Sequence, residues 1–407
     1  MVNFVSARSD AALRRLVRHA YANVPYYRRL FDACGLDPRT VRSAADLAAL
    51  PITTKADLQR DPDAFVSRGT DPSRLIGRNT SGSTGQPVVI RPSAYDEFRR
   101  HLARWRVDVL YGVRPGDRRA RFRMPRPLLA GDRMLLAVLS GTRLYRQQKI
   151  DSRLTGDELL SRLREFRPTI IDGMANSIDR AAQAALEASS TEVRPRYVVT
   201  GGDTITPEMR RRISTAFQTR VYDIFGAMEF GVIAYECPKT GLYHLADGVV
   251  TDVVRPDGSP ASDGEDGTVI ATSLLARAVP VIRYRTGDRA VRGPDTCPCG
   301  ARVGTLRSII GRERDVFRLS TGREVHPSDL PMRITPWIRT FQLEQQPDDR
   351  FLLRLVPSGE AGTRDFEDIR NAVHAVLGPS TEVAVEIVDA LVTEPNGKQR
   401  PYVALRR

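Results

Sequence analysis

Helical and extended segments alternate through the middle of the chain, and this alternation restricts the possible folds most strongly. Residues 156–166 and 177–187 have apolar side chains at helical spacing, whereas residues 169–171 and 197–200 read as short strands. Strands separated by helices form sheets whose faces the helices cover, with ligands at the carboxyl ends of the strands. The sequence therefore predicts an α/β fold with helices on both faces of a sheet.

Residues before and after this region extend the pattern. Helical spacing predicts a helix over residues 10–31 and an amphipathic helix over residues 95–111. A turn at Pro51 is expected to lead into a second, short helix, and residues 88–90 are expected to form a strand.

Beyond Val249 the pattern changes to hairpins, which predicts a β-rich subdomain. The strands and helix expected from there to the end of the chain are strands at 249–254, 267–273 and 281–284, a hairpin around 321–322, a hairpin over 341–356, a helix over 364–377 and a strand at 382–388. We therefore expect a large N-terminal domain, residues 1–312, and a small α+β C-terminal domain, residues 313–407.

Length and composition narrow the class of protein. A chain of 407 residues can bury a sizeable core and is long enough for two domains. No apolar run has the length of a membrane span, and the first residues lack the pattern of a signal peptide, so we expect a cytoplasmic protein with no membrane partner. The formal net charge is +13, but the arginines are dispersed, which is typical of solvated surface rather than of nucleic-acid binding.

The segment 79–87, with the sequence Asn-Thr-Ser-Gly-Ser-Thr-Gly-Gln-Pro, is a candidate phosphate-binding loop. Its glycines and hydroxyl groups can surround polyphosphate oxygens. A kinase or GTPase loop would place Lys and then Ser or Thr after the last glycine, where this chain has Gln86 and Pro87. Clusters of this composition also form solvated turns, so the segment is informative only together with other motifs.

Four further motifs follow this loop: Asp223-Ile-Phe-Gly-Ala-Met-Glu229, Tyr284-Arg-Thr-Gly-Asp288, Gly311-Arg-Glu-Arg-Asp315 and Asn396-Gly-Lys-Gln-Arg400. In this order they resemble the core motifs of the adenylate-forming superfamily of acyl-CoA synthetases, luciferases and peptide-synthetase adenylation domains. The segments 21–31 and 50–58 are similar to the opening of the phenylacetate-CoA ligase-like branch, which includes capsule-biosynthesis and coenzyme F390 synthetase-like proteins. The resemblance spans essentially the whole chain.

The resemblance implies an ATP site. The phosphate loop would bind the β- and γ-phosphates, and Asp288 would accept hydrogen bonds from the ribose hydroxyls. Glu229 would coordinate Mg²⁺, a hard cation that prefers oxygen ligands; a surface carboxylate at a strand end is the alternative. The ATP- or AMP-binding residues implied are Thr80, Ser81, Gly82, Ser83, Thr84, Gly85, Gly202, Asp203, Asp223, Phe225, Gly226, Asp288 and Arg312.

The resemblance also implies a mobile small domain. Lys398 matches the catalytic lysine, which would bring a cation to the carboxylate and α-phosphate oxygens as charge develops. Lysine is rare in this chain, which adds to the case for Lys398. Asp315 matches the hinge at which the small domain rotates between adenylation and acyl transfer.

The acyl pocket is the least defined part of the implied site. The candidates are Phe122, Met124, Met174, Ala175, Ala227 and Met228. Core packing is the alternative role for most of them. Arg121, Arg123 and Arg126 either pair with an acid or face water. Met228 departs from the Thr or Ser of many relatives, and a thioether cannot donate their hydrogen bond to the AMP phosphate.

Three cysteines and one histidine suggest a structural zinc site within residues 237–299. Cys237 is followed seven residues later by His244, and Cys297-Pro-Cys299 can aim two thiolates at one point. Such a set suits tetrahedral zinc. Cysteines kept reduced in turns are the alternative, because the Cys-x-Cys spacing is not specific. Some members of the resembling branch carry a similar Cys/His set.

The leading hypothesis is a ligase that uses ATP and Mg²⁺ to adenylate a small, aryl or other, carboxylic acid and transfers the acyl group to coenzyme A. The same motifs would serve transfer to a carrier-protein thiol or to an amine, or transfer of AMP to a hydroxylated cofactor. A basic nucleic-acid-binding protein is a hypothesis from a different class, and a non-catalytic nucleotide binder is a third. Because relatives in this branch are often dimers, a homodimer is a further expectation.

Overall fold

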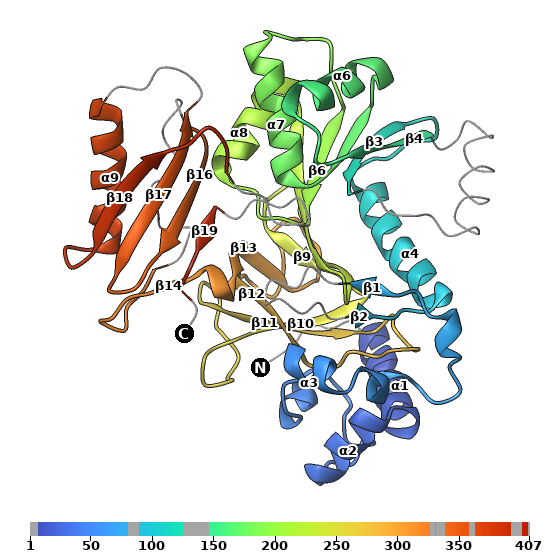
Figure 1. Ribbon diagram of the computed structural model, residues 1–407. Helices are drawn as coiled ribbons and strands as arrows, with labels where there is room; N and C mark the ends of the chain where they lie inside the picture. Colours follow the sequence, from blue (N-terminus) through green and yellow to red (C-terminus); the bar gives the residue numbers. More distant parts are fainter. Residues whose placement is uncertain are drawn as a thin grey trace. The chain divides into compact units, whose positions relative to one another are not determined.

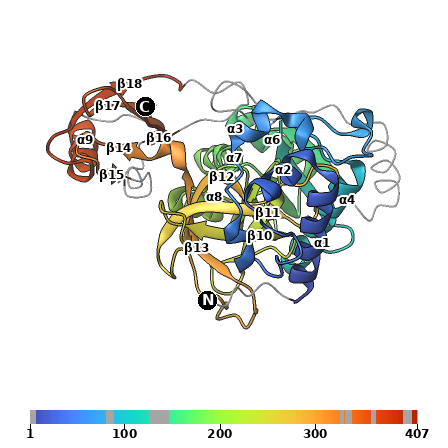
Figure 2. The ribbon, with the colours of Figure 1, turned by 90° about the horizontal axis from the view of Figure 1, so that it is seen from below.

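A computed structural model describes residues 7–79, 89–124, 146–325, 330, 338–357, 363–391 and 401–405. The chain divides into two compact units. The first comprises Met1–Arg114 and Tyr222–Ile309, and the second comprises Pro115–Val221 and Ile310–Arg407. Figure 1 and Figure 2 show the elements of each unit. Among the described residues, no helix combines the length and the apolar character that crossing a membrane requires.

The first unit contains a mainly antiparallel sheet. Its strand order is β10-β11-β12-β13-β9-β8-β7. The strands are β7 (Arg220–Ala227), β8 (Gly231–Glu236), β9 (Tyr243–Leu245), β10 (Val249–Val254), β11 (Asp266–Ser273), β12 (Tyr284–Arg292) and β13 (Thr305–Arg312). A separate antiparallel pair consists of β1 (Arg78–Asn79) and β2 (Val89–Ile90).

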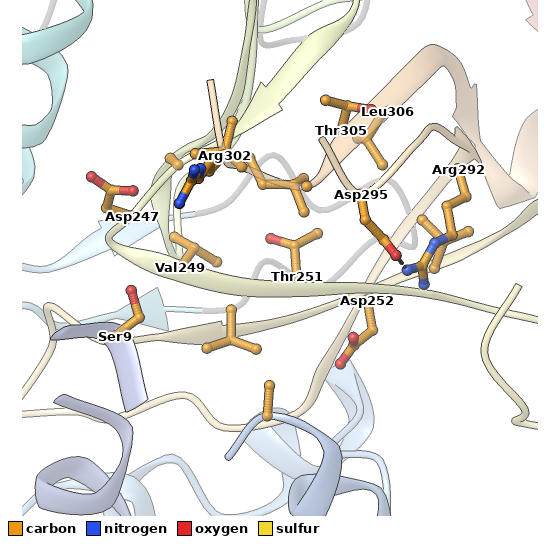
Figure 3. A pocket seen from close by; sticks show the side chains of 17 residues that line it. Ser9, Asp247, Val249, Thr251, Asp252, Arg292, Asp295, Arg302, Thr305 and Leu306 are labelled. Carbon is orange, nitrogen blue, oxygen red and sulfur yellow. Dashed lines mark hydrogen bonds and ion pairs between the residues drawn. The ribbon is translucent and has the colours of Figure 1, made fainter. Parts of the chain in front are cut away.

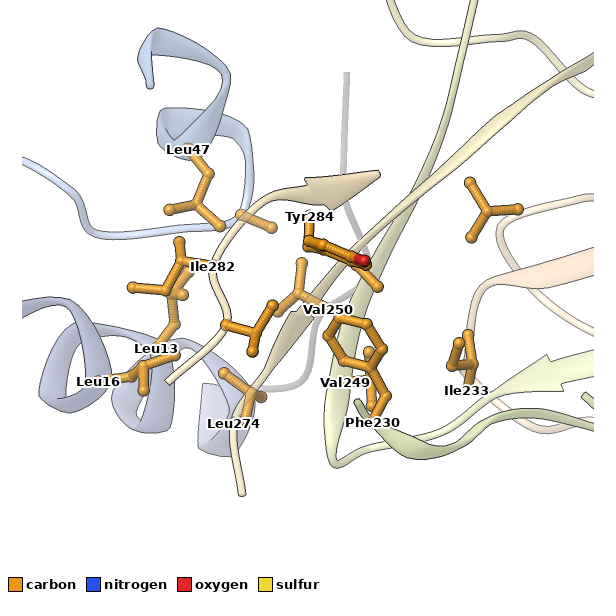
Figure 4. Packing of buried hydrophobic residues seen from close by; sticks show 14 of the residues in the cluster. Leu13, Leu16, Leu47, Phe230, Ile233, Val249, Val250, Leu274, Ile282 and Tyr284 are labelled. Carbon is orange, nitrogen blue, oxygen red and sulfur yellow. The ribbon is translucent and has the colours of Figure 1, made fainter. Parts of the chain in front are cut away.

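Helices at the start of the chain complete the core of the first unit. They are α1 (Ala7–Asn23), α2 (Pro25–Ala33) and α3 (Lys55–Arg60), and α4 (Ala94–Leu110) follows β2. Leu13 and Leu16 of α1 pack in one cluster with Val250 of β10 and Tyr284 of β12, as Figure 4 shows. Burial of this apolar surface joins residues that lie far apart in the sequence and stabilises the unit.

The second unit contains a parallel sheet and a smaller mixed sheet. The parallel strands are β3 (Arg118–Arg123), β4 (Arg146–Asp151), β5 (Ile170–Gly173) and β6 (Tyr197–Gly201), in the order β6-β5-β3-β4. The helices are α6 (Gly156–Phe166), α7 (Ala175–Glu187) and α8 (Pro207–Phe217). Their apolar side chains share one buried cluster with this sheet.

The last part of the chain has a buried cluster of its own, which includes Phe317, Leu353 and Val373. Its elements are β14 (Phe317–Arg318), β15 (Glu324–Val325), β16 (Ile338–Gln345), β17 (Arg350–Pro357), α9 (Thr363–Leu377), β18 (Glu382–Ile387) and β19 (Tyr402–Val403). The larger sheet has the order β18-β17-β16-β19. The domain boundary at residues 312 and 313 stays a prediction.

The predicted α/β class is confirmed, and two local predictions are wrong. The helix expected over residues 10–31 is two helices, because the chain is extended at Val24 and restarts at Pro25, which lacks a backbone N–H. The strand expected at 281–284 instead starts at Tyr284. Two side chains form hydrogen bonds with the backbone of Ile282, just before this strand. The Ile282 N–H donates to Tyr27 Oη (2.7 Å), and Thr53 Oγ1 donates to the Ile282 carbonyl (2.9 Å).

Candidate functional site

The motif from Asp223 to Glu229 forms β7 and the turn that leads into β8. The two strands pair antiparallel, with a register shift between Phe225 and Gly226. A Cβ atom at Gly226 would lie 2.3 Å from the carbonyl oxygen of Gly231, so this position accepts only glycine unless the hairpin moves. The glycine that follows Phe225 in this motif is therefore required by the close approach of two backbones.

Arg100 of α4 holds the turn that contains Glu229. Its guanidinium donates to the carbonyl oxygens of Met228 (3.0 Å) and Glu229 (2.6 Å), and it also contacts Glu97 Oε1 (3.2 Å). The side chains of Arg100 and Glu97 are almost completely buried, and Glu229 is 9% exposed. Glu229, the predicted magnesium ligand, is thus a buried residue on a turn that hydrogen bonds from Arg100 hold in place. Sequence reasoning missed Arg100, because 128 residues separate it from Met228.

Asp223 is also held by groups that the sequence did not indicate. Only 5% of its surface is exposed, and its Oδ2 accepts a hydrogen bond from Tyr243 Oη at 2.9 Å. Its backbone N–H donates to Glu236 Oε2 at 3.0 Å. A hydrogen bond to a charged group inside a protein is stronger than one between neutral groups. Two neighbouring strands, β8 and β9, therefore fix the position of this carboxylate.

Asp288 projects from a bulge in β12. Thr268 pairs with Arg289 and Ile270 pairs with Arg285, so one residue of β11 faces three residues of β12. Gly287, inside the bulge, has φ of +74°, a conformation that favours glycine. Thr286 Oγ1 accepts from the Asp288 N–H at 3.1 Å, and Asp288 is 6% exposed. The tripeptide Thr286-Gly287-Asp288 is therefore a bulge within β12 and not an exposed turn.

In the second unit, Gly202 and Asp203 follow the carboxyl end of β6. Gly202 has φ of +89°. The carboxylate of Asp203 accepts hydrogen bonds from the N–H groups of Ala175 (2.6 Å) and Asn176 (3.1 Å). It thus satisfies free donors at the start of α7, whose own N-cap residue, Met174, has no capping side chain. This role is visible in the structure and is separate from the predicted role of Asp203 in binding ATP or AMP.

The candidates for the acyl pocket differ in exposure. Phe122 and Ala175 have no exposed surface, and Phe122 packs in the core between the parallel sheet and its helices. The burial of both side chains agrees with packing, the alternative that the sequence left open. Met174 is 8% exposed at the end of β5. A pocket role for all six candidates stays a prediction.

The remaining predicted residues lie at a strand end or outside the described part. Arg312 ends β13, and Asp315 lies in a short 3₁₀ turn, Glu313–Asp315. Their binding and hinge roles stay predictions. Thr80, Ser81, Gly82, Ser83, Thr84, Gly85, Arg126 and Lys398 lie outside the described residues.

The structure brings the four predicted metal ligands together. The Sγ atoms of Cys237, Cys297 and Cys299 and one ring nitrogen of His244 all lie within 4.8 Å of one another. Cys299 Sγ and His244 Nε2 are 3.5 Å apart. Zinc bonded tetrahedrally to sulfur and nitrogen at the usual lengths would place these two atoms about 3.6 Å apart. The cluster has the ligand types and the spacing of a structural zinc site.

The pKa shifts at His244 and Cys237 suit a metal ligand, whereas burial raises the pKa of Cys299. Burial lowers the pKa of His244, which keeps the imidazole neutral and able to bind a metal. Burial opposes ionisation of Cys237, but hydrogen bonds from Thr240 and from the backbone outweigh it and lower the pKa of this thiol. The β8–β9 hairpin carries both Cys237 and His244, so the cluster and the groups that hold Asp223 share the same strands.

A pocket in the first unit lies beside β10 and β13 and is lined by none of the predicted site residues. Thr251 and Asp252 of β10 face it, together with Arg292 and Asp295, which form an ion pair at 2.7 Å (Figure 3). Both positively and negatively charged side chains therefore line this pocket.

Comparisons with known proteins agree with the motifs. No model of a known protein family matches the chain. A phenylacetate-coenzyme A ligase of Thermus thermophilus is 28% identical over 344 residues, which cover 80% of this chain and 74% of that protein. One from Escherichia coli is 29% identical over 358 residues, which cover 82% and 76%. The chain is thus similar to phenylacetate-coenzyme A ligases over about four fifths of its length. The resemblance predicted from the motifs is therefore confirmed.

A solved structure has the same fold as this chain. The crystal structure of 2-hydroxyisobutyryl-CoA ligase in the postadenylation state, in complex with R3-HIB-AMP, matches with a TM-score of 0.80 and 22% sequence identity. The match covers 98% of this chain and 89% of that one. At this identity the likeness establishes the fold alone, which this chain shares with that CoA ligase.

Proposed function

We propose that the chain is an ATP-dependent ligase that adenylates a small carboxylic acid and then transfers the acyl group to coenzyme A. The observation that carries this proposal is homology to phenylacetate-coenzyme A ligases over about four fifths of the chain. The buried carboxylates Asp223, Glu229 and Asp288, each held by a specific local structure, support it. Aryl acids are the first substrate class to test, because the relatives are named for one.

The first half-reaction joins two negatively charged partners. A carboxylate oxygen attacks the α-phosphorus of ATP, the bond to the bridging oxygen breaks, and pyrophosphate leaves with the electron pair. The thiol of coenzyme A then adds to the acyl carbon, loses its proton, and AMP leaves. Positioned cations and backbone donors lower both barriers, so the chain needs no nucleophilic side chain.

The site residues have distinct proposed roles. Glu229 would hold Mg²⁺, which would neutralise phosphate charge, and the Arg100 clamp keeps its turn in place. Asp288 would accept from the ribose hydroxyls, and Asp223 would contribute to the nucleotide pocket. Lys398 would stabilise charge on the α-phosphate, with rotation near Asp315 delivering the small domain, residues 313–407.

The Cys237, His244, Cys297 and Cys299 cluster would hold a structural Zn²⁺ ion. Four ligands complete a tetrahedral shell and leave no position open for a substrate. The ion would join the β8–β9 hairpin to the turn before β13, and it would take no part in adenylation.

The partners and the location are proposed less specifically. Transfer to a carrier-protein thiol or to an amine is an alternative second step, and nucleic-acid binding is not better supported by the relatives. A cytoplasmic location stays a prediction.

A homodimer is supported by an exposed apolar stripe on α4. Its residues, at a spacing of three and four, are Tyr95, Phe98, Leu102, Trp105 and Val109. Such a stripe matches the seam of paired helices and is complementary to a second copy of itself.

The size of this stripe fits the centre of an interface. Tyr95, Phe98 and Trp105 are 60%, 58% and 46% exposed. Together these rings leave on the order of 300 Å² open to water. A standard interface covers about 800 Å² on each partner, so the stripe would be the apolar centre of a dimer contact with a polar rim.

The test of the main proposal is ATP–pyrophosphate exchange with aromatic, aliphatic and amino acids, repeated with coenzyme A while products are identified by mass. Exchange together with an acyl-CoA product is the expected result. Exchange without a thioester would redirect the second step to a carrier protein or an amine. Absence of exchange with every acid, in folded protein that contains its metal, would refute the adenylation.

A further inference from the structure

Two pairs of adjacent residues in the β8–β9 hairpin connect the Cys/His cluster with Asp223. Glu236, whose Oε2 accepts from the Asp223 N–H at 3.0 Å, directly precedes Cys237 in the sequence. Tyr243, whose Oη donates to Asp223 Oδ2 at 2.9 Å, directly precedes His244. Both of these partners of Asp223 are therefore bonded in sequence to a candidate metal ligand.

The register of the hairpin shows how the two groups are connected. Glu236 of β8 pairs with Tyr243 of β9, and Tyr235 pairs with His244. Because side chains alternate between the two faces of a strand, Tyr243 points to one face of the sheet and His244 to the other. The connection between Tyr243 and His244 therefore passes through the backbone of the hairpin and not through contact of their side chains.

Hydrogen bonds close the tip of this hairpin. The Cys237 N–H donates to the Leu242 carbonyl at 2.7 Å, and the Gly241 N–H donates to the Cys237 carbonyl at 3.0 Å. Thr240 Oγ1 lies 3.3 Å from Cys297 Sγ, so the tip also contacts the segment that carries the other cysteines of the cluster. Because these bonds close the turn, a displacement of Cys237 also moves Leu242 and the strand that follows it.

The Cys/His cluster joins this hairpin to a distant part of the chain. Cys297 and Cys299 lie between β12 and β13, and their Sγ atoms lie within 4.8 Å of the two ligand atoms of the hairpin. A tetrahedral ion bound to all four atoms would fix both strands of the hairpin against that segment. Loss of the ion would remove this constraint at the positions that adjoin Glu236 and Tyr243.

One hydrogen bond and one ring stack near Asp223 do not involve the metal ligands. Tyr111, which follows α4, donates from its Oη to the Glu236 carbonyl at 2.9 Å. Its ring stacks on that of Tyr222, directly before Asp223, with 4.4 Å between the ring centroids. Loss of the ion should therefore loosen the placement of Asp223 without unfolding the hairpin.

We propose that Glu236 and Tyr243 are positioning residues that couple the Cys/His cluster to Asp223, so that a metal ion and ATP bind cooperatively. Such coupling is reciprocal, because each ligand raises the affinity for the other by the same factor. The ion acts through the position of Asp223 and does not touch the reacting atoms. This inference rests on the proposed function, in which Asp223 contributes to the nucleotide pocket, and it adds regulation of that site by metal occupancy.

The test measures both directions of the coupling in the full-length protein. Calorimetry gives the Kd of ATP for zinc-loaded protein and for protein from which a chelator, itself then removed by dialysis, has taken the zinc. Competition with a zinc-binding dye gives the Kd of zinc with and without saturating ATP. Excess Mg²⁺ keeps the nucleotide from binding zinc, and circular dichroism checks that the metal-free protein is folded.

The main variant is Tyr243→Phe, which removes the hydrogen bond to Asp223 and leaves all four metal ligands in place. Tyr21→Phe is the matched control, because Tyr21 Oη also donates to a carboxylate, Asp32 Oδ1 at 3.0 Å, on an exposed part of the helices α1 and α2. Each variant thus loses one hydroxyl group that donates to an acid. Both should contain as much zinc as the unaltered protein.

The expected result is a Kd of ATP that rises about fivefold or more when zinc is removed from the unaltered protein or from Tyr21→Phe, the lower end of typical coupling factors. Saturating ATP should lower the Kd of zinc by the same factor. In Tyr243→Phe, ATP should bind more weakly, and removal of zinc should change its Kd by about twofold or less. A purely structural role of Tyr243 would lower the melting temperature and leave the coupling factor unchanged.

Two results would overturn the coupling alone. One is ATP binding that is equally tight with and without zinc in folded protein, and the other is a coupling factor in Tyr243→Phe equal to that of the unaltered protein. Absence of ATP binding by the zinc-loaded protein would instead refute the proposed function, and the coupling with it. A protein that takes up no zinc would overturn the coupling by removing the cluster as a metal site.

Discussion

Breaking the Cys/His cluster is expected to loosen the strands that carry the candidate nucleotide site. The informative change is the double substitution Cys297→Ser with Cys299→Ser, which leaves Cys237 and His244 on their hairpin but removes the ligands on the other side. Cys34→Ser is the matched control, because Cys34 is an exposed cysteine outside the cluster. Both variants exchange sulfur for oxygen, but only the double variant removes residues of the cluster.

The magnitude follows from the length of chain that the link closes. A metal bound to Cys237 and Cys299 closes a loop of about sixty residues, for which the chain-entropy relation for cross-links predicts about 4 kcal/mol of stabilisation. This is a large share of the 5–15 kcal/mol that is typical of a folded protein. The double variant should therefore melt at a clearly lower temperature than the Cys34→Ser control.

The assay combines metal content with stability. Plasma mass spectrometry should find about one zinc ion per chain in the unaltered protein and in Cys34→Ser, and none in the double variant. A strong chelator should lower the melting temperature of the first two proteins but not that of the third. Hydrogen exchange should become faster at the amides of Tyr235 and His244, which pair across β8 and β9.

Two outcomes would refute this reasoning. The first is unaltered protein that contains no transition metal and melts as the double variant does. The second is a double variant that loses zinc with no change in melting temperature or hydrogen exchange, which would remove the structural role of the ion.

Three further changes test the candidate site and the assembly. Lys398→Ala should lower adenylation by roughly a hundredfold or more, the scale of one lost preorganised charge contact; unchanged pyrophosphate exchange in folded protein would contradict this role. Gly226→Ala should destabilise the protein by about 1–3 kcal/mol or more, because the new methyl group would meet the Gly231 carbonyl at 2.3 Å; a thermal melt equal to that of the unaltered protein would show that the hairpin adjusts. Leu102→Glu, on the exposed stripe of α4, should convert a dimer to a monomer in light scattering; an unaltered protein that is monomeric at high concentration would reject the dimer.

Much of the site was predictable because its residues follow one another in short motifs. The Thr286-Gly287-Asp288 tripeptide and the aromatic-glycine pair before Glu229 indicate turns and close approaches, which depend on local backbone chemistry. The α/β class was predictable for a similar reason, since helical and strand periodicities are properties of neighbouring residues. The prediction of a strand at 281–284 was wrong because Tyr27 and Thr53, near the start of the chain, form hydrogen bonds with the backbone N–H and carbonyl groups of Ile282.

The sequence by itself determined the resemblance to the phenylacetate-coenzyme A ligases, the order of the motifs and the residue types of the Cys/His cluster. Only the tertiary structure decided which distant groups hold those residues: Arg100 at the Glu229 turn, Tyr243 at Asp223, and Asp172 among the arginines of β3. The physical reason is that buried charges need partners, and a chain can supply a partner from any distance in sequence. Such a pairing leaves no periodic or local signal, so it becomes visible only when the strands and helices are packed together.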